Sequence, residues 1–235
     1  DALVIQTSAS LGYARHIGIR FVETEWFAFI DSDVIVLPTW FNVVYKYTKY
    51  DKVGAIEGSY ISLDFSINQS LNLNGTLRSH QVIRKLSLEE LSANTIIRHG
   101  FVYARSIQNN ALIRKEAVKD WVPNPYLNAY EDLAITQHVI RKGYYWLFID
   151  APLALHGNPP RSNLDKLRAS IRKGLWEGAG IKYASIPRSF IALYAVTRLL
   201  GAVYRLVKHN DPFNLAMRMA FLLSMPSNRY LVVRR

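Results

Sequence analysis

The feature that most constrains the fold is the alternation of short apolar runs with stretches of helical periodicity up to Gly157. This alternation is typical of an α/β domain. The expected strands are residues 2–6, 26–30, 53–61, 144–149 and 152–157, and 109–118 should be a strand passing into a short helix. Helices are expected at 10–22, 38–50 and 130–143. Residues 62–100 are expected to form a long loop that contains one helix.

Beyond residue 157 the pattern changes to helices alone, at 189–210 and 212–225, the second opening at Pro212 after an Asp211 cap. The charge changes with it. Residues 1–156 hold 15 basic and 15 acidic residues, whereas 157–235 hold 14 basic and 3 acidic ones, so the whole excess of +11 lies there. We therefore expect a catalytic or binding domain at 1–157 and a basic helical extension at 158–235.

The extension combines cations with apolar residues. Arg198, Gly201, Arg205 and Lys208 are spaced to form a narrow stripe along an otherwise apolar helix, and no charge-free stretch reaches the ~18 residues of a membrane span. Basic amphipathic helices suit an anionic membrane surface, and we expect a peripheral position on the cytoplasmic face of a membrane. The alternative is that both helices pack on the domain and on each other. Nucleic acid is not expected, because the cations alternate with apolar side chains.

Two aspartates interrupt an apolar run in "WFAFIDSDVIVLP". If the segment is extended, Asp31 and Asp33 project on one side about 6–7 Å apart, at the end of a buried strand. The chain has no cysteine, so a metal has to be held by carboxylates, histidines and water. Hard oxygen ligands suit Mg²⁺ or Mn²⁺. A solvated turn is the alternative reading of such a triplet.

Three separated blocks share residues with one known family. The first is "GYARHIGIRFVETEWFAFIDSDVIVLPTWF", with Gly12, Ala14, Arg15 and Gly18 before the aspartate pair; the others are "YEDLAITQHVIRKGY" and "PLALHG". Together they resemble family 2 glycosyltransferases over Gly12 to His156. The pattern of the usual N-terminal strands, with the acids that hold the nucleotide base, is not found before this block, and we expect either that the chain is a fragment or that its first strands are replaced or supplied from elsewhere.

The resemblance implies a GT-A (Rossmann-like) α/β fold that binds a nucleotide-sugar donor through a divalent cation. It implies an inverting, hexosyltransferase-type enzyme with a saccharide or lipid-linked acceptor. Asp31 and Asp33 match the family's metal triplet, and His156 matches a histidine that is a further ligand in some members. Asp31 also belongs to the donor site. A purely structural role at the end of a strand is equally compatible with His156.

Asp132 matches the family's catalytic base, and Glu131 beside it is expected to orient the acceptor or the base. The alternative is that both acids only complement the helix dipole. Arg15 is expected to reach a phosphate oxygen of the donor, or else to face solvent. Trp40 and Trp121 are better explained by core packing than by stacking on a sugar or base.

Three rival functions remain. A glycoside hydrolase also uses two carboxylates, but it needs no metal triplet. A nucleic-acid-binding module would rest on the basic extension alone. A membrane-associated pseudoenzyme would share the surface properties of the glycosyltransferase without its catalysis.

Overall fold

The computed structural model describes residues 3–64, 110–158, 162–184 and 188–225. Most of the predicted loop at 62–100 lies outside these residues. The described residues belong to two compact units. A sheet unit comprises residues 19–121 and 135–160, and a helical unit comprises 1–18, 122–134 and 161–235. The predicted division into 1–157 and 158–235 stays a prediction.

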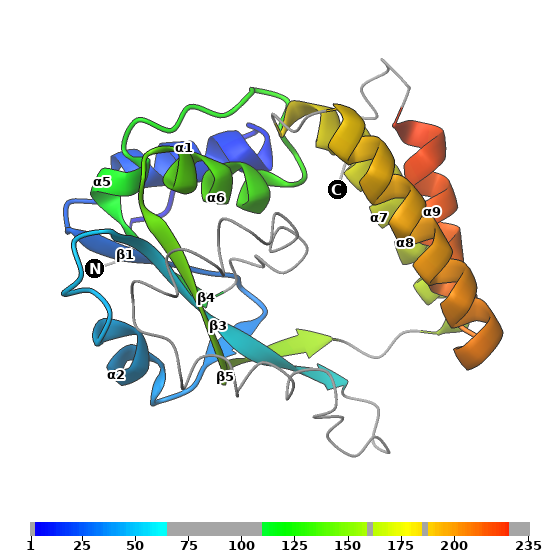
Figure 1. Cartoon of the computed structure of the whole chain (residues 1–235), viewed down its shortest axis with the longest axis horizontal. Helices are drawn as coiled ribbons and strands as arrows, with labels where there is room; N and C mark the ends of the chain where they lie inside the picture. Colours follow the sequence, from blue (N-terminus) through cyan, green and yellow to red (C-terminus); the bar gives the residue numbers. More distant parts are fainter. Residues whose placement is uncertain (1–2, 65–109, 159–161, 185–187, 226–235) are drawn as a thin grey trace. The chain divides into compact units, whose positions relative to one another are not determined.

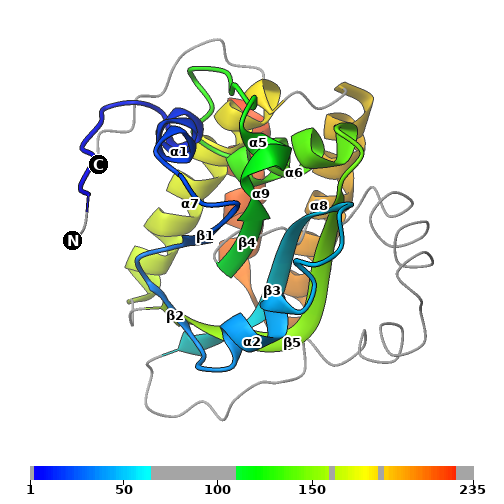
Figure 2. The ribbon, with the colours of Figure 1, turned by 90° about the vertical axis from the view of Figure 1, so that its left-hand side faces the viewer.

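The sheet unit is built on five strands in the order β1-β4-β3-β5-β2. Their bounds are β1 Trp26–Ile30, β2 Val34–Val36, β3 Val53–Asp64, β4 Asn110–Arg114 and β5 Tyr145–Asn158. Strands β3 and β5 run side by side and parallel, while the other pairs are antiparallel (Figure 2). The predicted strands at 144–149 and 152–157 form one strand, since β5 continues along β3 past register shifts at Ser59.

Two predicted strands differ from the structure. The run 26–30 is predicted to be fully buried, but among the described strands β1 lies at the edge and pairs with β4 alone, and Ile30 is exposed. An edge strand has a neighbour on one side only, so apolar composition alone does not bury it. Residues 3–6 form no strand, and Leu3 and Val4 are exposed because they pair with no strand among the described residues.

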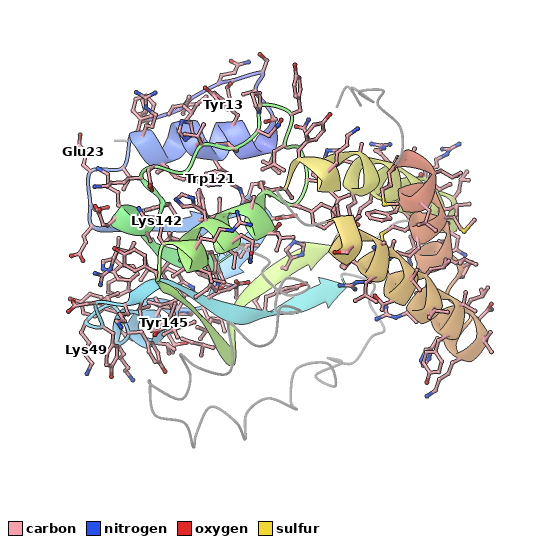
Figure 3. All side chains as sticks on the ribbon, turned by 45° about the horizontal axis from the view of Figure 1, so that its top comes forward. Tyr13, Glu23, Lys49, Trp121, Lys142 and Tyr145 are labelled. Atoms are coloured by element: carbon pink, nitrogen blue, oxygen red, sulfur yellow. The ribbon has the colours of Figure 1, made fainter. Side chains whose placement is uncertain are left out.

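Buried aromatic and polar side chains hold the centre of the sheet unit. Trp40, which begins α2 (Trp40–Tyr45), donates from its indole Nε1 to the carbonyl of Asn110 at 3.0 Å. The Asn110 amide bridges the backbone of Gly58 at 2.9 and 3.0 Å. Both predicted core tryptophans are buried, and Trp121 is labelled in Figure 3. Since unpaired polar groups are costly in an interior, these hydrogen bonds hold β3, β4 and the start of α2 together.

The helices α2, α5 and α6, the last of which has its first turn in the helical unit, begin and end near their predicted bounds, with one exception. The prediction at 38–50 is too long, since α2 ends at Tyr45, where Tyr47 and Thr48 donate to carbonyls three residues back instead of four. A short α5 (Lys115–Val118) follows β4. Helix α6 (Glu131–Arg141) stops before Gly143, whose φ of +84° suits glycine. Figure 3 labels Lys142 just past α6, where its ammonium donates to Asp120 at 2.7 Å.

The helical unit contains α7 (Asn163–Gly180), a short 3₁₀ turn, η3 (Ile181–Tyr183), α8 (Arg188–His209) and α9 (Pro212–Ser224). Helix α9 packs against both α7 and α8 (Figure 1). Asp211 caps α9 by accepting from the Asn214 N–H at 3.3 Å, which confirms the predicted start. None of the helices in the described ranges is long and apolar enough to cross a membrane.

Close backbone contact between α7 and α9 comes from small residues. Gly174 and Gly178 lie one turn apart on α7, and a methyl group added to either would overlap Met217 O or Ser224 Oγ of α9. The adjoining core consists of Ile181, Ile191, Ala195 and Phe221. A second tight contact brings helix α1 (Leu11–Arg20) to the segment before α6, where the Gly12 N–H donates to the Leu127 carbonyl at 2.8 Å.

Candidate active site

The aspartate pair lies in a tight turn between β1 and β2. The Val34 N–H donates to the Asp31 carbonyl at 3.0 Å, so residues 31–34 form a hydrogen-bonded turn. The expected extended geometry is therefore wrong, because the chain changes direction here to leave β1 and join β5. Both aspartates nevertheless belong to this four-residue turn, which directly follows the end of β1 as predicted.

Strand pairing brings Asp33 to the histidine of the third sequence block. Val34 is the register partner of His156 in β5. As a result, His156 Nε2 lies 3.6 Å from Asp33 Oδ2, although the two residues are far apart in the sequence. The Asp33 side chain is 57% exposed and that of His156 25% exposed. The ring of Tyr60 packs beside the imidazole, with 5.4 Å between centroids.

The Asp33–His156 pair offers one carboxylate and one imidazole nitrogen with much of the carboxylate open to solvent. This donor set fits a divalent cation that keeps positions for water or substrate oxygens. Within the described ranges, no three acidic or histidine side chains come together as a metal-binding cluster. The structure thus assembles two of the three predicted ligands, and Asp31 occupies the same turn.

In the helical unit, Glu131 and Asp132 open α6 as predicted. Arg15 of α1 pairs with Glu131, with 3.2 Å between Nη2 and Oε1, and both side chains are largely buried. The alternative that Arg15 faces solvent is therefore wrong, and Glu131 is not a freely solvated acid. The contact of Arg15 with a donor phosphate stays a prediction.

Asp132 is half-buried, and its Oδ1 accepts from the Leu133 N–H at 2.7 Å. Burial, and next the charge of Glu131, raise the pKa of Asp132 from 3.8 to about 7. Arg15 and the Leu133 N–H act in the opposite direction but do not cancel the increase. A carboxyl group that titrates near neutrality can both take and hold a proton, as a general base must.

A residue that sequence reasoning missed lies close to this acid pair. Glu177 of α7 is near the hydroxyl of Tyr130, the residue that precedes the pair, with 3.5 Å between Tyr130 Oη and Glu177 Oε2. The sequence does set this residue apart, because Glu177 is one of only three acids among the last 79 residues, which are strongly basic.

Comparison with known proteins supports the resemblance. The model of the glycosyl transferase family 2 domain matches residues 4–120, about half of the chain. The match includes Arg15, Asp31 and Asp33, whereas the acid pair of α6 and His156 lie beyond it. No curated protein matches the chain. The family has the GT-A α/β fold, with which the mixed sheet and its helices agree. The chain belongs to glycosyl transferase family 2, so it is a glycosyltransferase whose substrates are a nucleotide-sugar donor and an acceptor.

Proposed function

We propose that the chain is an inverting, metal-dependent hexosyltransferase in which Asp132 is the general base. The observation that carries this proposal is the environment of Asp132. It is a half-buried acid with a pKa of about 7, next to a second acid whose charge is paired with Arg15. Two neighbouring carboxyl groups with environments this different commonly have separate roles in a site.

In the proposed reaction, the Asp132 carboxylate accepts the proton of the acceptor hydroxyl. The hydroxyl oxygen then forms a bond to the anomeric carbon of the donor, and the bond from that carbon to the nucleoside diphosphate breaks. A single displacement inverts the configuration at the anomeric carbon. Glu131, held by Arg15 at 3.2 Å, orients the acceptor or Asp132.

Asp33 and His156, together with Asp31 in the same turn, are the residues that would hold Mg²⁺ or Mn²⁺. A bound divalent cation neutralises the charge that develops on the leaving diphosphate. The 3.6 Å separation of the Asp33 and His156 side chains supports this assignment. Arg15 reaches a phosphate oxygen in the proposal, in addition to its contact with Glu131.

We also propose that the protein works at an anionic membrane surface, on the cytoplasmic face, with a saccharide or lipid-linked acceptor. Helix α8 supports this proposal, because one of its faces is both apolar and exposed. That face comprises Leu193, Val196, Leu200, Val203, Tyr204 and Val207. We refer to these six residues as the α8 apolar face. The exposed cations Arg205 and Lys208 flank it.

The proposal is tested by offering the protein a panel of nucleotide sugars with Mn²⁺ and measuring nucleotide release. Asp132→Asn should lower kcat by about 10²- to 10⁴-fold, the usual contribution of a general base. Asp33→Asn should raise the Mn²⁺ concentration needed for half-maximal rate. Asp51→Asn is the matched control, since Asp51 is an exposed aspartate outside the site.

Unchanged release by Asp132→Asn would remove this residue from the base role. An unchanged Mn²⁺ requirement in Asp33→Asn would remove the turn from the metal role. Absence of release by the wild type with every donor and several acceptors would favour the pseudoenzyme instead.

A further inference from the structure

A chain of polar side chains runs from α9 through α7 to the residue before the acid pair. Arg218 of α9 lies 3.4 Å from Glu177 Oε2, measured from Nη1, and the same oxygen lies 3.5 Å from Tyr130 Oη. The side chains of Arg218 and Glu177 are only 11% and 17% exposed. Low exposure strengthens such charge-assisted contacts, because little water competes for them.

The packing of α7 on α9 determines where this chain of contacts lies. Glu177 and Gly178 follow Gly174 by three and four residues, so both lie on the same face of α7 as Gly174. The two glycines allow the backbones of α7 and α9 to approach closely. Arg218, which follows Met217 at that contact, is thereby brought to Glu177.

At the other end, Tyr130 has an unusual backbone conformation. Its φ is +63°, in the left-handed region that non-glycine residues rarely adopt. The Tyr130 carbonyl accepts from the Ala134 N–H at 2.9 Å, so this residue is where the chain turns into α6. Such a conformation is maintained only when surrounding contacts hold it.

The direction of the Tyr130 hydrogen bond follows from the charges. Burial and the nearby charge of Glu177 raise the pKa of Tyr130 above its usual value. The phenol therefore keeps its proton and donates it to the Glu177 carboxylate, which can only accept while ionised. Arg218 places a positive charge 3.4 Å from the same Glu177 oxygen, on the side of α9.

We propose that Tyr130, Glu177 and Arg218 are positioning residues that fix the left-handed turn before α6 and so aim Asp132 at the acceptor hydroxyl. None of the three needs to touch substrate. The inference rests on the proposed role of Asp132 as the base. It assigns to α7 and α9 a part in catalysis that is separate from any membrane contact of α8.

The charges around Asp132 make the inference testable by pH. Besides burial, Glu131 and Glu177 raise the pKa of Asp132, whereas Arg15 lowers it. The titratable or charged groups that face this cluster from all elements packed on it are Arg15, Glu131, Lys173, Glu177, Tyr194 and Arg218. Removing the charge of Glu177 should therefore lower the pKa of Asp132, even if the other charges around it stay as they are.

The experiment uses the full chain with ¹³C-labelled aspartate, titrated by NMR, with the Asp132 signal assigned by its loss in Asp132→Asn. In Glu177→Gln, the pKa of Asp132 should fall by about 0.5 unit or more. Lys173→Met is the control, because Lys173 also faces Glu177, at 3.9 Å, but is 62% exposed and screened by water. That variant should leave the titration unchanged.

Steady-state kinetics supply the second readout, with whichever nucleotide sugar the panel identifies. Tyr130→Phe removes one oxygen atom and should lower kcat about tenfold with KM unchanged, as expected when the base is misplaced. The acidic limb of kcat/KM in Glu177→Gln should move to lower pH together with the NMR titration. An Asp132 titration that is the same in Glu177→Gln and the wild type overturns the inference.

The two proposals fail separately. If Asp132→Asn stays active while Glu177→Gln still shifts the Asp132 titration, the base assignment is wrong and the coupling between α7 and Asp132 stands. If Asp132→Asn is inactive and the titration does not respond to Glu177→Gln, the base assignment stands and the positioning role is wrong. Wild-type kcat in Tyr130→Phe also contradicts the positioning role.

Discussion

Among single residues, Asp132 is distinguished by its burial beside a second acid. The sequence identified it only through the block "YEDLAITQHVIRKGY", which also suits an acid pair that merely complements a helix dipole. A residue in that lesser role would keep a low pKa. Burial, and next the charge of Glu131, raise the pKa of Asp132 instead. The charge of Glu131 can be read from the sequence, but the burial depends on packing that the local sequence does not encode.

The raised pKa of Asp132 predicts how stability depends on pH. Because the folded pKa, about 7, lies above the ordinary value of 3.8, the folded state holds this proton more tightly than the unfolded state. The resulting stabilisation is present below pH 3.8 and is lost as pH rises through 7. An asparagine does not titrate, so Asp132→Asn lacks this pH-dependent loss of stability. The fall in its Tm between pH 5 and pH 9 should be smaller than that of the wild type by at least about 2–4 °C.

Thermal unfolding of both proteins at the two pH values measures this effect, with Asp51→Asn as the control for loss of an exposed aspartate. Equal falls in Tm for wild type and Asp132→Asn would show that the carboxyl group is ionised throughout this range. The comparison between variants is needed because other groups also titrate between pH 5 and pH 9.

At the scale of elements, local signals predicted helix ends better than they predicted strand burial. Asp211 with Pro212 correctly gave the start of α9, and Gly143 gave the end of α6, because caps act within a few residues. The run "WFAFI" gave a strand but not its exposure. Exposure depends on the order of strands in the sheet, which is set by partners distant in the sequence.

The difference between local signals and distant contacts also explains which parts of the candidate site could be predicted. The spacing of Asp31 and Asp33 predicts an extended segment, whereas a turn hydrogen bond from the Val34 N–H to the Asp31 carbonyl decides their geometry. His156 lies beside Asp33 because Val34, the next residue after Asp33, pairs with His156 in the sheet; its role as a metal ligand stays a prediction. Glu177 was missed, since it meets Tyr130 across 47 residues and belongs to a segment that reads as a surface extension.

Helix packing gives a prediction of its own. A methyl group at Gly174 would overlap the Met217 carbonyl of α9, so Gly174→Ala should lower the free energy of unfolding by about 1–3 kcal/mol, as overpacking commonly does. Gly201→Ala in α8 is the matched control, because no atom lies within 4 Å of a methyl group there. It should be neutral or stabilise by up to about 1 kcal/mol.

Urea unfolding of the two variants decides between packing and simple helix propensity. If Gly174→Ala were as stable as Gly201→Ala, α7 and α9 would not pack as closely as the structure shows. The outcome also bears on Arg218, which reaches Glu177 through the same contact.

For the whole molecule, the uneven distribution of charge is the main property that the family assignment leaves unexplained. The excess of +11 falls entirely after residue 156, among helices that carry the α8 apolar face. A nucleotide-sugar substrate is anionic, but its site needs only a few cations. The remaining charge agrees with the proposed anionic lipid surface, which attracts Lys and Arg by about 1 kcal/mol each.

If the α8 apolar face enters the interface of a bilayer, a charge introduced there should oppose binding. Val207 and Leu200 are 82% and 64% exposed, so Val207→Glu and Leu200→Glu should each weaken binding to phosphatidylglycerol-containing vesicles about tenfold, as loss of one buried apolar side chain implies. Leu164→Glu, at an exposed leucine of α7, is the control and should have little effect. Arg205→Gln with Lys208→Gln should instead reduce the preference for anionic over neutral vesicles. Equal cosedimentation of the wild type and both α8 glutamate variants would show that this face does not meet lipid.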